Sequence, residues 1–168
     1  KKVVISAPAK EVDITIVQGV NNHLLSHKDQ IISNGSCTTN CLAPIVMILD
    51  KYLGIDSGFM TTIHSFTGDQ RTVDQTHTDL RRARTASDSM IPTSTGAARA
   101  LSLVLPNLKD KLDGTAIRVP TPNVSLIDLT FVSKKKTNID AINKLIIKAS
   151  KTRKLKNILT VNNLSLVS

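Results

Sequence analysis

The stretch that decides the fold is NGSCTTNCLAPIVMILDKYLG, residues 34–54. Asn34-Gly35 is a strong turn pair. Apolar residues then recur at the spacing of one helical face: Leu42, Ile45, Val46, Leu49 and Leu53. The pattern predicts a helix that begins near Cys37 and ends at Gly54, since glycine is common just past a helix end.

Shorter patterns on both sides of this helix predict a class that mixes strands with helices. Apolar runs predict strands at 2–6, 13–17, 31–33, 58–66, 114–119 and 123–133. Helices are predicted over 97–101, closed by Pro106, and from Thr137 to about Ser150. The polar stretch 67–90 has little periodicity and is predicted to be a loop, which at this length is usually functional. We therefore expect an α/β (α+β-like) fold with a mixed, largely antiparallel sheet and helices packed on one face.

Composition limits the classes of partner. The net charge of +9 would suit a nucleic-acid binder, but one Tyr, three Phe and no Trp leave little to stack on bases. Phosphorylated small molecules match the basic excess better, and we expect neither nucleic acid nor a membrane as partner. Two cysteines are too few for a disulfide framework, which favours the cytoplasm. Because a strand follows Lys1-Lys2 directly, we expect a piece of a longer protein.

Cys37 is the first candidate for chemistry. In the first turn of a helix, unpaired backbone N–H groups and the helix dipole favour the thiolate, which is the nucleophilic form. The alternative for Cys37 is a small residue packed under the helix, and this alternative is favoured for Cys41. Two cysteines four residues apart, with no further Cys or His cluster, do not complete a zinc site, so we expect no metal.

His64 is the candidate base. It is predicted near the end of strand 58–66, with polar neighbours and a loop after it. A lone histidine is more often structural than catalytic, but a histidine on a strand can pair with a cysteine at a helix start. Spacing alone does not show that the side chains of His64 and Cys37 meet.

A third group of residues suits anions. Small donors lie in loops and helix starts at Ser36, Thr38, Thr67, Thr95 and Gly96. Thr95-Gly96 precedes a predicted helix, whose first N–H groups can bind phosphate. Arg81 and Arg118 are candidates for two-pronged contacts. The alternatives are that both arginines cover a solvated surface and that Thr95 is only a helix cap.

Five ordered motifs across the whole chain resemble those of phosphorylating glyceraldehyde-3-phosphate dehydrogenases of the bacterial and chloroplast type. They are NGSCTTNCL (34–42), HSFTGDQR (64–71), DLRRAR (79–84), PTSTGAA (92–98) and RVPTPNVS (118–125). Gly35 departs mildly from the family, which usually has alanine or serine there. The resemblance implies the tail of a Rossmann-type NAD(P)-binding domain over 1–35 and a catalytic domain over 36–168, incomplete at its C-terminus.

The same resemblance implies roles for the candidate residues. Cys37 would be the nucleophile that forms a thioester, and His64 the base that assists it. The substrate's phosphate would be bound by Thr67, Arg81 and Arg118. Inorganic phosphate would be bound by Ser36, Thr38, Thr95, Gly96 and, as a shared ligand, Arg118. Asp69 would orient the arginines, and Ser6 would make a minor contact to the cofactor.

Partners follow from the resemblance too: NAD or NADP as cofactor, glyceraldehyde 3-phosphate and inorganic phosphate, and a homotetramer for the full-length form. The chain has no Gly-x-Gly-x-x-Gly fingerprint, so the choice between NAD and NADP is not encoded here. Two alternatives stay open: an erythrose-4-phosphate dehydrogenase, and a truncated inactive fragment that serves as an assembly or binding module. The run 95–98 favours the triose enzyme, and the intact candidate residues disfavour decay.

Overall fold

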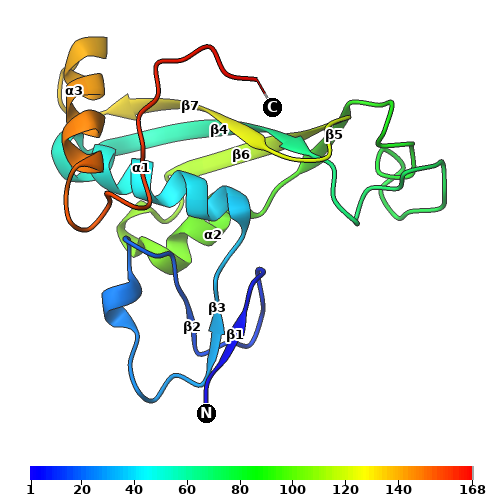
Figure 1. Ribbon diagram of the computed structural model, residues 1–168, viewed down its shortest axis with the longest axis horizontal. Helices are drawn as coiled ribbons and strands as arrows, with labels where there is room; N and C mark the ends of the chain where they lie inside the picture. Colours follow the sequence, from blue (N-terminus) through cyan, green and yellow to red (C-terminus); the bar gives the residue numbers. More distant parts are fainter. Residues whose placement is uncertain (168) are drawn as a thin grey trace.

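The computed structural model describes residues 1–167 and folds them into two sheets and three α-helices (Figure 1). The helices are α1 (Cys37–Leu53), α2 (Ala97–Val104) and α3 (Ile139–Ser150), with 3-10 turns η1 (Asn22–Leu24) and η2 (Pro106–Leu108). The strands are β1 (Val3–Ile5), β2 (Ile14–Thr15), β3 (Ile31–Ser33), β4 (Ile55–Ser65), β5 (Ile91–Ser94), β6 (Leu112–Val119) and β7 (Ser125–Ser133).

The larger sheet confirms the predicted mixed class. Its strand order is β5-β6-β4-β7, with β4 and β6 parallel and the two outer pairings antiparallel. The parallel register runs unbroken over eight residue pairs, from Gly58↔Leu112 to Ser65↔Val119, and pairs His64 with Arg118. The smaller sheet, in the order β1-β3-β2, is parallel throughout.

One hydrophobic core lies under the larger sheet. In Figure 1, α1 and α2 lie between the two sheets and cover one face of the larger one. Buried side chains from both helices pack there with Met60 of β4 and Leu112 of β6. Val17 and Val20, which precede η1, join the same cluster. Because burying one large apolar side chain contributes about 1.5–3 kcal/mol, this core is what holds β4 and α1 together.

Helix α1 begins and ends as its sequence predicts. Ser36 is the N-cap, and its Oγ accepts a hydrogen bond of 3.0 Å from the Thr39 backbone N–H. Gly54 ends the helix at φ 72°, a conformation that costs glycine little because it has no Cβ. The buried stripe includes Leu42, Val46 and Leu49, so the predicted apolar face is the one that packs on the core.

The structure differs from the predicted elements at several boundaries. Strand β5 was not predicted, because Pro92 lies in it; a proline is tolerated there since β5 is an edge strand. Only Ile14–Thr15 of the predicted strand 13–17 is strand, because the Asn21 side chain accepts from the Val17 N–H and turns the chain. Helix α3 begins at Ile139 because Asn138 is its N-cap, not a helical residue.

Candidate active site

Cys37 and His64 meet where α1 begins and β4 ends. The Cys37 Sγ lies 3.1 Å from His64 Nε2. The geometry follows from element lengths: the 16 steps of α1 span about 24 Å and the nine steps from Ile55 to His64 span about 30 Å. Since β4 runs back along the helix that precedes it, its ninth step returns to the level of the helix start. The structure therefore brings together the two residues that the sequence could not place side by side.

The His64 ring is buried and has two neighbours at Nδ1. The Ser65 carbonyl oxygen lies 2.7 Å away, and Arg118 Nη1 lies 2.6 Å away. The carbonyl can only accept and the guanidinium can only donate, so Nδ1 carries a hydrogen when it pairs with Ser65 and lacks one when it pairs with Arg118. The position of Arg118 thus decides which nitrogen of the neutral ring is protonated.

Burial and charge act on the titrating groups. Burial lowers the pKa of His64 below its ordinary value; the hydrogen bond to Ser65 opposes this, and the charge of Arg118 adds to it. Burial also lowers the pKa of Arg118, the Cys37 sulfur opposes this, and the like charge of Arg82 adds to it. Burial first, and Cys37 second, raise the pKa of Cys41 above its ordinary value. The site thus favours a neutral imidazole beside Cys37.

Cys37 opens into a cavity of about 330 Å³. Its lining comes from the start of α1, the end of β4 and the start of β7: Cys37, Thr38, Cys41, Ser65, Val124, Ser125 and Ile127. Such a volume holds a small metabolite rather than a large ligand. The cavity therefore leaves the Cys37 thiol accessible to a small molecule.

Some of the other predicted donors already make hydrogen bonds within the protein. Ser36 caps α1, and its Oγ also contacts Thr39 Oγ1 at 2.7 Å. Thr95 Oγ1 accepts from the Ala97 N–H at 3.2 Å, while the N-cap residue of α2 is Gly96. Gly96 stands at the start of α2 with open space around it. Ser6 follows β1 at the sheet edge from which β3 leads into α1.

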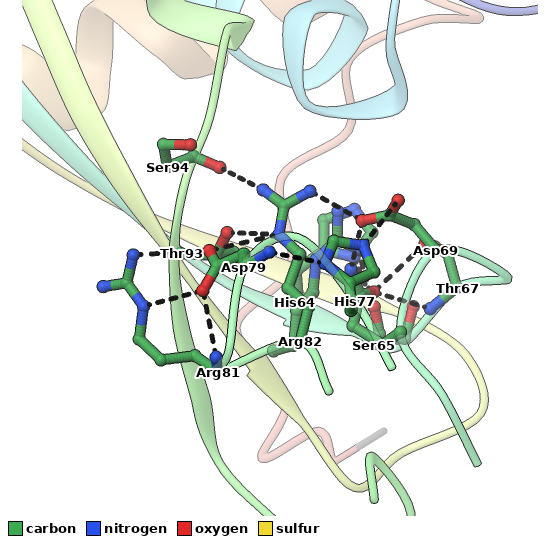
Figure 2. A network of polar contacts seen from close by, with 12 residues as sticks. His64, Ser65, Thr67, Asp69, His77, Asp79, Arg81, Arg82, Thr93 and Ser94 are labelled. Atoms are coloured by element: carbon green, nitrogen blue, oxygen red, sulfur yellow. Dashed lines mark hydrogen bonds and ion pairs between the residues drawn. The ribbon is translucent and has the colours of Figure 1, made fainter. Parts of the chain in front are cut away.

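Arg81 does not reach the polar group formed by Asp69 and Thr93; Arg82 binds there instead (Figure 2). Arg81 donates to Asp79, two residues earlier, from Nε to Oδ1 at 3.2 Å and from Nη2 to Oδ2 at 3.3 Å. The Arg81 side chain is 60% exposed. Arg82 donates from Nε to Thr93 Oγ1 at 2.7 Å and from Nη1 to Asp69 Oδ2 at 2.6 Å. Arg82 Nε also lies 3.7 Å from Asp79 Oδ2, so both arginines lie beside the same carboxylate, and the sequence held no signal to choose between them.

Most of the basic excess lies away from Cys37. Nine of the 22 Lys and Arg residues, but only one of the 13 Asp and Glu residues, fall within residues 134–156, which gives a net charge of +8 out of +9. This segment is α3 and its flanks, at the far end of α1 from Cys37 (Figure 1). Net charge therefore carries no information on where a phosphate would bind.

Two further searches apply to residues 1–167. No helix there is long and apolar enough to cross a bilayer. Nor do these residues bring together three or more His, Cys, Asp or Glu side chains in a group that could hold a metal ion.

Comparison with known proteins identifies the family. The family model described as glyceraldehyde 3-phosphate dehydrogenase, C-terminal domain, matches residues 36–168. A glyceraldehyde-3-phosphate dehydrogenase of Zymomonas mobilis is 59% identical over 169 residues, which cover 100% of this chain and 50% of the relative.

Two more relatives agree. Glyceraldehyde-3-phosphate dehydrogenase 2 of Bacillus subtilis is 55% identical over 153 residues (90% of this chain, 45% of the relative). The chloroplastic glyceraldehyde-3-phosphate dehydrogenase A of Scenedesmus vacuolatus is 56% identical over 169 residues (100% of this chain, 54% of the relative). The chain spans about half the length of the curated relatives it matches. It belongs to the glyceraldehyde-3-phosphate dehydrogenase family and carries that family's C-terminal domain.

Proposed function

We propose that this chain supplies the catalytic half of a phosphorylating glyceraldehyde-3-phosphate dehydrogenase, which converts glyceraldehyde 3-phosphate and inorganic phosphate to 1,3-bisphosphoglycerate in glycolysis. The observation that carries the proposal is the 3.1 Å contact between Cys37 Sγ and His64 Nε2 beside an open cavity. Relatives that align with the whole chain are glyceraldehyde-3-phosphate dehydrogenases, which supports the triose substrate over erythrose 4-phosphate.

The proposed chemistry begins at Cys37. Its thiolate adds to the aldehyde carbon and forms a hemithioacetal. His64 Nε2 then accepts the hydroxyl proton, and a thioester to Cys37 remains. Inorganic phosphate displaces the thiolate from the acyl carbon, which releases the acyl phosphate and restores Cys37. If Arg118 Nη1 leaves His64 and donates to a bound phosphate instead, His64 Nδ1–H can donate to the Ser65 carbonyl. His64 Nε2 is then free to act as the base.

NAD or NADP is the cofactor that this reaction requires, and when bound it accepts the hydride from the substrate carbon. The residues present fit one side of such a site. The carboxyl ends of parallel strands β1 and β3 lie together, and ligands of open parallel sheets bind at that edge. Ser6 would contact the cofactor there, and residues 1–35 would be the tail of the cofactor domain, with 36–168 as the catalytic domain. The glycine fingerprint that holds a pyrophosphate does not occur in the sequence.

Two arginines would bind the phosphates. Arg118 lies beside His64, and its Nε is buried without a hydrogen-bond partner among residues 1–167. Arg82 is held by Thr93 and Asp69, and its like charge lowers the pKa of Arg118, after burial as the main cause. Two half-buried guanidinium groups that repel each other are stabilised when an anion lies between them. We assign Thr67, Thr95 and Gly96 as further donors to these anions, together with Ser36 and Thr38 at the start of α1.

The uncovered face of the larger sheet supports the proposal of a homotetramer. Apolar side chains lie exposed on this face: Phe59 and Ile63 of β4 with Leu126 and Val132 of β7. Contiguous exposed apolar surface on a sheet marks a subunit contact. Light scattering on the variant Leu126→Asp, compared with wild type, tests whether this face joins subunits.

The test of the function uses a completed protein, defined as residues 1–168 joined to the segments that flank the aligned region in the Zymomonas mobilis relative. Cofactor reduction should require glyceraldehyde 3-phosphate and phosphate together and should vanish in Cys37→Ser. Cys41→Ser is the matched control and should keep activity. Turnover in Cys37→Ser, or preference for erythrose 4-phosphate, would reject the proposal.

A further inference from the structure

Gln70 is buried in a loop whose neighbours are exposed. Only 3% of its surface is accessible. Its Oε1 accepts from the Thr67 N–H and the Thr67 hydroxyl, each at 3.1 Å, and its Nε2 donates to Asp69 Oδ2 at 3.0 Å. A backbone N–H can only donate, so Thr67 fixes the oxygen of the amide on its own side. The amide NH₂ must then face Asp69.

His77 is oriented by the same logic. The Asp79 N–H donates to His77 Nδ1 at 2.9 Å, so Nδ1 carries no hydrogen and the neutral ring is protonated at Nε2. His77 Nε2 faces Asp69 Oδ1 at 3.7 Å, and the His77 side chain is 14% exposed. The ring thus turns its donor towards Asp69, although at this distance the contact is electrostatic rather than a full hydrogen bond.

The Asp69 carboxylate, oriented by Gln70 and His77, in turn accepts a hydrogen bond from Arg82. Figure 2 shows its carboxylate between His77 on one side and the Arg82 guanidinium on the other. Oδ2 accepts from Arg82 Nη1 at 2.6 Å, while Arg82 Nη2 lies 3.4 Å from the Ser94 carbonyl oxygen. The Asp69 side chain is itself half exposed, so without its two other donors it would be free to turn into solvent.

We propose that Gln70 and His77 are positioning residues for Arg82: together they hold the Asp69 carboxylate in the orientation that directs the guanidinium towards inorganic phosphate next to Thr95. Neither residue touches the phosphate. The inference rests on the proposed function, since it concerns the anion that Arg82 would bind there. It goes beyond that function by assigning roles to two residues outside the nucleophile, the base and the anion ligands.

Two substitutions distinguish the roles of the two ring nitrogens of His77. In His77→Gln the amide nitrogen reaches about as far as Nε2 and can donate to Asp69. In His77→Asn the amide oxygen lies about where Nδ1 lies and keeps the acceptor for the Asp79 N–H. If His77 acts through Asp69, the asparagine variant loses phosphate affinity and the glutamine variant keeps it. A purely structural role in the turn predicts the opposite order.

Gln70→Glu tests the other contact, because it keeps the acceptor for Thr67 and sets a carboxylate against Asp69. Phosphate affinity is measured in the completed protein from the apparent KM for phosphate, and independently from the effect of phosphate on the rate of Cys37 alkylation. We expect Gln70→Glu and His77→Asn to weaken phosphate binding about tenfold, with a smaller change in the KM for glyceraldehyde 3-phosphate.

Arg84→Gln is the matched control, because it breaks an exposed ion pair with Asp74 (3.2 Å) in the same loop. Unchanged phosphate affinity in Gln70→Glu and His77→Asn, or an equal loss in Arg84→Gln, would overturn the inference. If Gln70→Glu unfolds on heating far below wild type, the order of the two His77 variants decides. A wild-type protein with no response to phosphate would reject the proposed function instead, so the two failures are distinguishable.

Discussion

Replacing Arg118 by lysine should separate phosphate binding from surface charge. Arg118 Nη1 donates to the Ser65 carbonyl at 2.9 Å, and the rest of the guanidinium remains for an anion. A lysine has one ammonium group, which can serve the carbonyl or the anion but not both in the same geometry. Loss of one hydrogen bond to a charged group costs about 1.5–3 kcal/mol, or roughly 10- to 150-fold in kcat/KM.

The assay is steady-state cofactor reduction by the completed protein, with phosphate and glyceraldehyde 3-phosphate varied separately. Both KM values should rise, or kcat should fall, within that range, while the thermal midpoint changes little. Arg84→Lys, at an exposed arginine of the same protein, provides the control for loss of a guanidinium in general. Wild-type kcat/KM values in Arg118→Lys would refute the reasoning and return Arg118 to a structural role.

Three further outcomes are expected. The pKa of His64 should lie below 6.5 in an NMR titration and should rise in Arg118→Gln, because a neighbouring positive charge is removed. Because the pKa of His64 is lower in the folded than in the unfolded protein, the unfolded chain takes up this proton first as the pH falls. The contribution of His64 to stability is therefore complete above pH 6.5 and is lost as the pH falls from there through the pKa of the folded state. Iodoacetamide should modify Cys37 before Cys41, and equal rates would contradict the assignment. Residues 1–168 alone should not reduce the cofactor, since orientation is worth roughly 7–11 kcal/mol in such steps; turnover near that of the completed protein would show that the cofactor is held by other means.

Local features of the sequence predicted the elements that carry the site. The helix from Cys37 to Gly54 was predictable because its cap, its periodicity and its end are all encoded within about 20 residues. Strand β4 followed from its apolar and β-branched content, although it begins at Ile55, three residues earlier than expected.

Other features depend on tertiary contacts that no local pattern records. The meeting of Cys37 and His64 depends on the direction in which β4 returns along α1. Strand β5 depends on an edge position that makes Pro92 acceptable. The direction of Arg82 depends on acceptors at Thr93 and Asp69, which lie 11 and 13 residues away in sequence. Such partners become visible only when the chain is folded.

The unbroken parallel register between β4 and β6 has a consequence for tolerated length variation. His64 and Arg118 are paired residues in that register, so their separation is set by the two strands and not by the chain that connects them. A change in the length of the loop 67–90 would therefore leave His64 and Arg118 in place, but it would disturb the contacts that position Arg82. A single deletion inside β6, between Leu112 and Arg118, would instead turn the arginine to the opposite face of the sheet. The strand register thus sets the base and its arginine, and the loop separately sets Arg82.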